Sequence, residues 1–146
     1  MLSRRRVLGI VVLVCTLAAL ALADQPYMQA ARTNLQQARA QLQFARANKA
    51  GHRAKALEHV NAAISLVNSG ITFDRRHNHA QSALGEVFNT TAAPDQPHMQ
   101  AALNLLREAK GNLERATSDK GGFRKKAIDK VNDAIDETKK GIDAGE

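Results

Sequence analysis

Cysteine is almost absent from this sequence of 146 residues, because Cys15 is the only one and lies in an apolar run near the N-terminus. If that run is removed from the mature protein, no thiol remains, which excludes disulfide bonds, thiolate catalysis and cysteine-ligated metals. Tryptophan is absent as well, and aromatic residues make up only 3% of the chain. Such a composition leaves little surface for stacking on nucleic-acid bases, so nucleic acid is not an expected partner.

The sequence also lacks the common catalytic motifs. It contains no Gly-x-Ser-x-Gly, no His-Glu-x-x-His and no phosphate-binding loop. Nor does it contain Glu-x-x-His, the pair that di-iron helical bundles require. We therefore expect a protein that is not an enzyme and that carries no organic cofactor.

The N-terminus has the features of an export signal. Arginines at positions 4–6 precede an apolar run over 7–22, which ends at the small-x-small motif Ala21-Leu22-Ala23. We predict a signal peptide over 1–23, cleaved after Ala23, and a secreted or periplasmic protein. The alternative is an uncleaved anchor, for which the run is short of the roughly 20 apolar residues of a bilayer span. Residues 3–8 resemble a twin-arginine signal, and an ordinary Sec signal remains the other export route.

The remaining chain repeats itself. A shift of 71 residues aligns 24–71 with 95–142 without a gap, with 22 identities in 48 positions, beginning with Asp-Gln-Pro in both copies. Such self-similarity predicts a tandem duplication. Loss of the three signal arginines lowers the formal net charge from +7 to +4.

Each copy has the pattern of a helical hairpin. In both predicted helices of copy one, apolar residues recur every three or four positions, which places them on one helix face. In the first helix they are Met28, Ala31, Leu35, Ala38, Leu42 and Ala45, and in the second Leu57, Val60, Ile64, Val67 and Ile71. The second copy repeats both stripes, with Thr138 in place of Val67 as a polar flaw. Asp24-Gln25-Pro26 and its counterpart at 95–97 suit helix starts, whereas Gly51 and Gly121-Gly122 suit tight reversals.

These patterns predict an all-α protein whose two hairpins form one four-helix bundle. The predicted boundaries are a signal peptide at 1–23, hairpin repeats at 24–71 and 95–146, and a linker with a short helix at 72–94, with Gly70 and Gly141 marking the exits of the second helices. A solenoid is the competing architecture, but two repeats are too few to stack one stably.

The sequence resembles two groups of proteins. The phrases DQPHMQAALNLLREAKGNLERATSDKGGFRKKAIDKVNDAIDETKKGI and GHRAKALEHVNAAISLVNSGITFD are similar to small exported bacterial tandem-hairpin proteins of uncharacterised function. This resemblance implies the hairpin fold and carries no active site. Gly51-His52 and His59 resemble a spacing found in small histidine-containing periplasmic metal-binding helical proteins, from which the second copy departs at Phe123 and Lys130.

Candidate metal ligands lie in two places. Asp74, His77 and His79 form the densest cluster, in the predicted linker, and His-x-His can hold copper, nickel or zinc. His52 and His59 share a helix face, but seven residues separate them by about 10 Å, so they would need a partner from another helix. Solvated polar side chains are the alternative interpretation for both sets.

Basic residues gather around both predicted bends. They are Lys49, Arg53 and Lys55 at the first bend and Lys120, Arg124 and Lys126 at the second. We interpret them as candidate anion-binding residues, with charge for solubility as the alternative. The sequence therefore predicts a noncatalytic structural or interaction module of the bacterial envelope, with metal buffering and binding of anionic ligands as alternative functions.

Overall fold

The chain folds into four α-helices, as a computed structural model describes for residues 24–45, 49–77, 95–116 and 120–144. They are α2 (Asp24–Phe44), α3 (His52–His77), α4 (Asp95–Arg115) and α5 (Phe123–Asp143). Two short 3₁₀ turns, η1 (Lys49–Gly51) and η2 (Lys120–Gly122), precede α3 and α5. The predicted all-α class with four helices is confirmed for this part of the chain, which contains no strand. The predicted signal peptide lies outside it, and so does the predicted linker from residue 78 onward.

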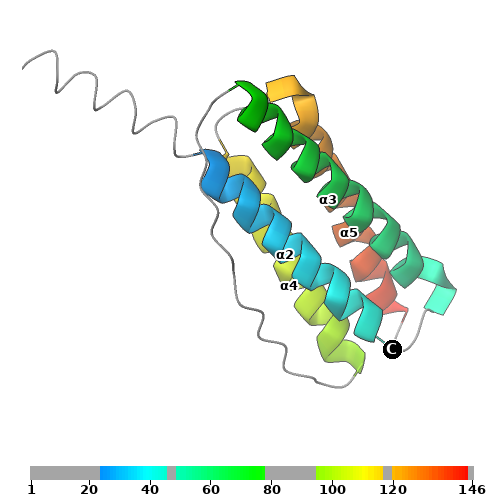
Figure 1. Cartoon of the computed structure of the whole chain (residues 1–146). Coiled ribbons are helices and arrows are strands. Elements are labelled where there is room, and N and C mark those ends of the chain that lie inside the picture. The colour runs from blue at the N-terminus through cyan, green and yellow to red at the C-terminus, as the bar shows by residue number, and fades with distance from the viewer. Residues whose placement is uncertain (1–23, 46–48, 78–94, 117–119, 145–146) are drawn as a thin grey trace, which may run out of the picture.

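The two hairpins pack face to face (Figure 1). α2 lies antiparallel beside α4, and α3 lies antiparallel beside α5. Cross-contacts fix this register: Gln41 near the end of α2 meets His98 at the start of α4, and Gly70 near the end of α3 lies beside Phe123 at the start of α5. The α2–α3 bend and the α4–α5 bend therefore lie at opposite ends of the bundle.

The predicted apolar stripes form the core. All six stripe residues from Met28 to Ala45 are buried, the last of them directly after α2. In the α3 stripe Val60, Ile64, Val67 and Ile71 are buried, whereas Leu57 is only partly buried. Each of the following buried positions of the second hairpin comes 71 residues after a buried position of the first: Met99, Ala102, Leu106, Ala109, Leu113, Ala116, Ala127, Val131, Ala134 and Ile135. Alanines in these stripes let the helix backbones approach closely, which favours tight packing.

Thr138 fits this apolar interior because its polar atom has a partner. The side chain is fully buried, and its Oγ1 donates a hydrogen bond of 2.7 Å to the Ala134 carbonyl one turn earlier. A buried hydroxyl without a partner would be costly. This hydrogen bond to the helix backbone explains how a polar residue is accommodated in the apolar stripe.

Helix α3 is longer than the glycine pattern predicts. The sequence pattern predicts that α3 ends at Gly70, yet the helix continues through Gly70 to His77. The glycine serves close packing instead: a Cβ there would lie 2.9 Å from Cε of Met28 in α2. Gly141 likewise lies inside α5, and a Cβ added there would lie 2.6 Å from Cε of Met99. Asp74, Arg75 and Arg76 consequently belong to a helix and not to the linker that the sequence predicts.

The two bends share one backbone device, two successive residues with positive φ. Gly121 and Gly122 adopt φ of 71° and 73°, whereas the first bend has Ala50 at 55° and Gly51 at 81°. The left-handed region costs a residue with a Cβ about 1–2 kcal/mol. Ala50→Gly is therefore expected to stabilise the protein by about 1 kcal/mol, measured by urea unfolding.

Gly51→Ala is the matched control for that substitution. A Cβ at Gly51 meets no atom within 4 Å, so any destabilisation comes from the backbone conformation alone. We expect a loss of about 1 kcal/mol or more. A destabilising Ala50→Gly would contradict the positive φ at this position.

Candidate functional site

Charge is distributed unequally between the two ends of the bundle. We define the basic end as residues 24–34, 61–77, 107–116 and 120–131, and the neutral end as 35–45, 49–60, 95–106 and 132–144. The basic end carries eleven Lys or Arg against five Asp or Glu, whereas the neutral end carries six of each. The excess positive charge of these ranges thus lies at the basic end, and Lys130 at its border pairs with Asp133 of the neutral end at 2.9 Å.

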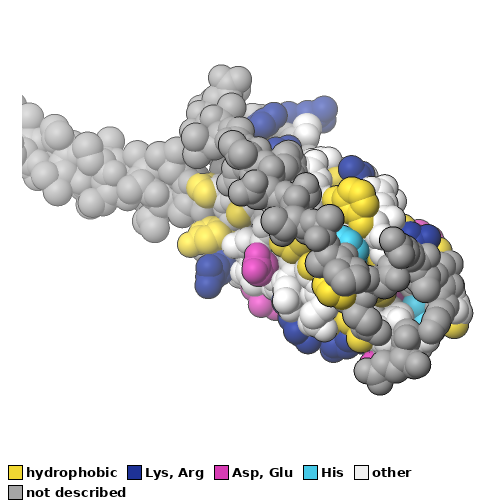
Figure 2. Space-filling model, turned by 90° about the horizontal axis from the view of Figure 1, so that it is seen from below, with side chains coloured by type: hydrophobic (Ala, Val, Ile, Leu, Met, Phe, Trp, Pro, Cys, Tyr) yellow, Lys and Arg dark blue, Asp and Glu magenta, His cyan; other side chains and the backbone are white. Residues whose placement is uncertain are grey.

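Side chains from three helices contribute to this excess. Arg75 and Arg76 end α3, Arg115 ends α4, and Lys125 and Lys126 lie in the first turn of α5; all five are exposed. At the neutral end, acidic side chains of α5 offset the basic residues of the first bend. Figure 2 shows the bundle of Figure 1 from below, and in this view basic and acidic side chains are interspersed over the described surface.

The six predicted anion-binding residues are thereby separated. Lys49, Arg53 and Lys55 lie at the neutral end and Lys120, Arg124 and Lys126 at the basic end. Lys55 and Lys126 are exposed at positions 71 residues apart. The side chains of Lys49 and Lys120 lie outside the described part.

The two arginines of this set hold the bends together. Arg53 Nη1 donates to the Leu42 carbonyl at 3.2 Å, and Arg124 Nη1 donates to the Leu113 carbonyl at 3.1 Å. Both acceptors lie in the last turn of the preceding helix, where carbonyls lack intrahelical partners. A cation there also complements the negative end of the helix dipole. Both guanidinium groups therefore bind backbone within the chain.

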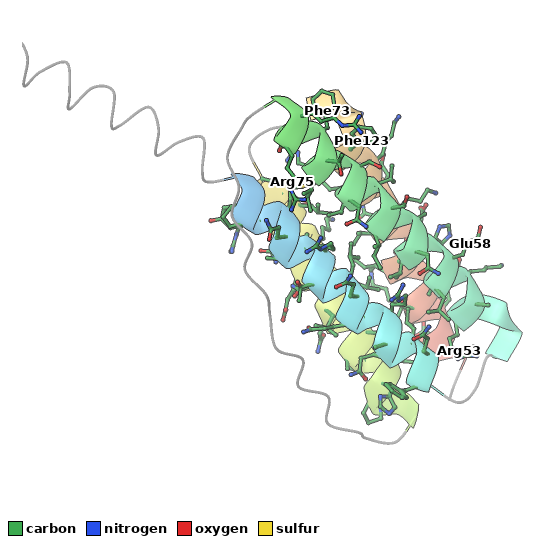
Figure 3. All side chains as sticks on the ribbon, viewed as in Figure 1. Arg53, Glu58, Phe73, Arg75 and Phe123 are labelled. Atoms are coloured by element: carbon green, nitrogen blue, oxygen red, sulfur yellow. The ribbon has the colours of Figure 1, made fainter. Side chains whose placement is uncertain are left out.

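A groove opens on the outer face of α3 at the basic end. Its volume is about 580 Å³, and we call it the aromatic groove; it is lined by Ser65, Asn68, Ser69, Thr72, Phe73, Arg76 and Phe123. Phe73 and Phe123 come from different hairpins, with ring centroids 6.3 Å apart and planes tilted by 57°. Figure 3 shows these two rings together at one end of the bundle, far from Arg53 at the other.

A second groove, between α4 and α5, has a different character. Its volume is about 510 Å³, and charged side chains of both signs line it: Arg107, Lys110, Glu114, Asp136 and Lys139. Opposite charges side by side offset one another there. Of the two grooves, only the aromatic groove combines apolar rings, uncharged polar groups and a single cation.

Histidine–carboxylate pairs join α3 to α5 at the neutral end. His52 Nδ1 lies 2.8 Å from Glu137 Oε2, and His59 Nδ1 lies 3.7 Å from Asp133 Oδ2. Hydrogen bonds from His52 and from Lys140 lower the pKa of Glu137 to about 2. The hydrogen bond from Lys130 lowers the pKa of Asp133.

This geometry predicts an acid-dependent stability. Because the pKa of Glu137 is lower in the folded state than in the unfolded chain, its contribution is present above the unfolded pKa and is lost as pH falls through about 2. The wild type should melt at a higher temperature than Glu137→Gln at pH 6. The two melting temperatures should converge as pH falls from about 4.5 to 2, as measured by circular dichroism. A constant difference across that range would show that the carboxylate charge is not responsible.

The predicted metal ligands do not come together in the described part of the chain. His52 and His59 lie at the neutral end, whereas Asp74 is buried in the last turn of α3 at the basic end. Within 24–45, 49–77, 95–116 and 120–144, no group of three or more His, Cys, Asp or Glu is placed to hold an ion. His79 and the His77 side chain lie outside these residues, so the linker metal site stays a prediction.

Sequence reasoning missed five residues of the basic end and its groove: Phe73, Arg75, Arg76, Arg115 and Phe123. Arg75 and Arg76 were assigned to a linker because Gly70 suggested a helix exit. The approach of Phe73 to Phe123 depends on the mutual orientation of the hairpins, for which no sequence signal exists. One signal is present in the 71-residue comparison: neither ring is repeated in the other copy, because Phe73 corresponds to Ala144 and Phe123 to His52.

Comparison with known proteins adds no assignment. None of the described helices is long and apolar enough to cross a membrane. Protein-family models, curated proteins and solved structures give no match to this chain.

Proposed function

We propose that this chain is an exported, noncatalytic interaction module that holds an anionic component of the bacterial envelope at the basic end of its bundle. In this proposal residues 1–23 are the cleaved export signal, and the two hairpins derive from one duplicated unit. The observation that carries the proposal is the charge polarity of the bundle, with eleven basic against five acidic residues at one end and six of each at the other.

The length of the bundle supports a localised site. A helix of 21 residues, such as α5, is about 31 Å long, since each residue rises 1.5 Å. The Debye length is about 10 Å at 0.1 M salt, so charges at one tip of the bundle scarcely influence those at the opposite tip. Only where the two ranges meet do their charges pair, as Lys130 does with Asp133. A general solubility charge would not require such a division, whereas attraction of one anionic partner benefits from it.

The proposal is tested by two charge-reversal variants with the same change in net charge. Arg115→Glu/Lys126→Glu alters exposed residues of the basic end, and Lys55→Glu/Lys139→Glu alters exposed residues of the neutral end. Lys55 and Lys126 are corresponding residues, 71 positions apart, in the first turn of α3 and of α5. The probe is inorganic polyphosphate, titrated by calorimetry against the mature chain at several salt concentrations.

We expect the wild type to bind polyphosphate with an affinity that falls steeply as salt rises. The basic-end variant should lose at least tenfold in affinity, whereas the neutral-end variant should lose less than threefold. Equal losses in the two variants would refute a localised site. Absence of wild-type binding at low salt would refute the function itself.

A further inference from the structure

The aromatic groove contains recognition chemistry that charge alone does not require. Along α3 it presents Ser65, Asn68, Ser69 and Thr72, which share one helix face because their spacings are three, one and three residues. None of these side chains is ionisable, although the groove lies at the basic end. Ser69 Oγ donates to the Ser65 carbonyl at 3.0 Å, which leaves its own lone pairs as acceptors.

This row of groups matches the hydroxyl groups of a sugar. Hydroxyl and amide side chains both donate and accept hydrogen bonds, as sugar hydroxyls do. The rings of Phe73 and Phe123, both partly exposed, offer an apolar surface against which the C–H face of a pyranose can pack. From Ser65 to Arg76 the groove follows α3 for about 17 Å, which accommodates a short oligosaccharide.

Arg76, the one cation of the lining, indicates that the expected sugar carries a negative charge. Arg76 lines the groove, and a guanidinium pairs with a carboxylate through two parallel hydrogen bonds. Arg75, Lys125 and Lys126 add positive potential at the same end. An acidic peptide would satisfy the charge and would offer backbone groups to the polar row of α3, so it is the competing partner in the experiment below.

The corresponding positions of the other hairpin show that this lining is specific to one end. Seventy-one residues after Ser65, Asn68, Ser69 and Thr72 stand Asp136, Lys139, Lys140 and Asp143. All four change from uncharged to charged. Two positions between them, by contrast, are identical in the two hairpins, Gly70 with Gly141 and Ile71 with Ile142.

We propose that the aromatic groove binds an acidic glycan, a carbohydrate chain bearing carboxylates, with its sugar rings on Phe73 and Phe123 and a carboxylate on Arg76. This inference rests on the proposed function and names the class of its anionic partner. It predicts that binding depends on uncharged side chains of α3 and not only on positive charge.

One set of substitutions separates sugar recognition from simple attraction. Ser65→Asp/Asn68→Lys/Ser69→Lys places on α3 the residues that α5 already carries at the corresponding helical positions, so the helix should tolerate them. The triple variant is more positive than the wild type by one charge. A site that only attracts anions would therefore bind as well or better. A glycan site would lose three groups that both donate and accept hydrogen bonds, because Lys only donates and ionised Asp only accepts.

The experiment titrates oligogalacturonate into the full mature chain by calorimetry, with polyphosphate as the anion without sugar. We expect oligogalacturonate to bind, the triple variant to lose at least tenfold in affinity for it, and polyphosphate affinity to change by less than threefold. Phe73→Leu, which keeps bulk but removes the ring, should also weaken oligogalacturonate binding alone. The control Asp136→Ser/Lys139→Asn, at the corresponding positions of α5, should leave both affinities unchanged.

The outcomes distinguish the inference from the function on which it rests. If polyphosphate binds but oligogalacturonate does not, or if the triple variant retains oligogalacturonate, the glycan site is overturned and the basic end remains a general anion site. If polyglutamate binds more tightly than oligogalacturonate and needs the same α3 residues, the partner is an acidic peptide. If the wild type does not bind polyphosphate at low salt, the proposed function fails, and the glycan site that rests on it fails as well. Circular dichroism melts confirm that each variant is folded.

Discussion

Either hairpin expressed by itself, residues 24–77 or residues 95–146, is expected to be unfolded as a monomer. The largest contact surface of α2 lies on α4 and that of α3 lies on α5, so each helix depends mainly on the other hairpin. A single hairpin would expose side chains such as Leu35, Leu42 and Val60, all fully buried in the whole chain. In proteins most helical stability comes from tertiary packing of the apolar face, which a single hairpin lacks.

Circular dichroism at 222 nm and analytical ultracentrifugation measure this effect together. Mixing the two hairpins in equal amounts should restore the helical signal, because each supplies the surface that the other lacks. Helix formation that appears only with increasing concentration, as a second copy replaces the missing hairpin, also agrees with mutual burial. A monomeric hairpin that melts like the whole chain would contradict it.

Leu35→Ala and Leu106→Ala are each expected to destabilise the protein by about 3–4 kcal/mol. Both leucines are fully buried, at positions 71 residues apart, on the α2 and α4 faces that meet in the core. Their removal loses transfer free energy and leaves a cavity that rigid helices cannot close. Because a domain has about 5–15 kcal/mol of stability, either change removes a large part of it.

Urea unfolding of the two variants provides the measurement, and Leu105→Ala provides the control. Leu105 is adjacent to Leu106 in α4 but is only partly buried, so its truncation should cost clearly less. The two buried positions should give values within about 1 kcal/mol of each other, since their surroundings are similar. A small loss at Leu35 or Leu106, comparable with that at Leu105, would show that the core is not formed as described.

The parts of the fold that follow from local patterns were predictable. The spacing of Met28, Leu35 and Leu42 defines a helix face that is buried in the structure. Pro26 suits the first turn of a helix, and α2 indeed begins at Asp24. Such signals depend on neighbouring residues only, which is why sequence reasoning recovers them.

The end of α3 was not predictable from the same rules. A glycine after an apolar stripe usually suggests a helix exit. Gly70 instead gives room to Cε of Met28, a residue 42 positions earlier in the chain. In the sequence, a glycine that ends a helix looks the same as a glycine that makes room for a neighbouring side chain. Only the tertiary contact distinguishes the two.

The candidate site depended still more on tertiary arrangement. The sequence shows two similar basic bends but not that they lie at opposite ends of the bundle. Only the antiparallel packing of α3 on α5 brings Arg75 and Arg76 to the second bend and Glu137 to His52 of the first. The difference between the basic end and the neutral end therefore arises when the hairpins associate.

Amide chemical shifts test most directly where an anion binds. Tripolyphosphate is titrated into the ¹⁵N-labelled mature chain at low salt, and the shift changes are mapped onto the bundle. We predict saturable changes at Arg75, Arg76, Arg115, Lys125 and Lys126, with little change at Lys55 and Lys139. Changes centred on the neutral end, or the same small change along all four helices, would contradict a binding site at the basic end.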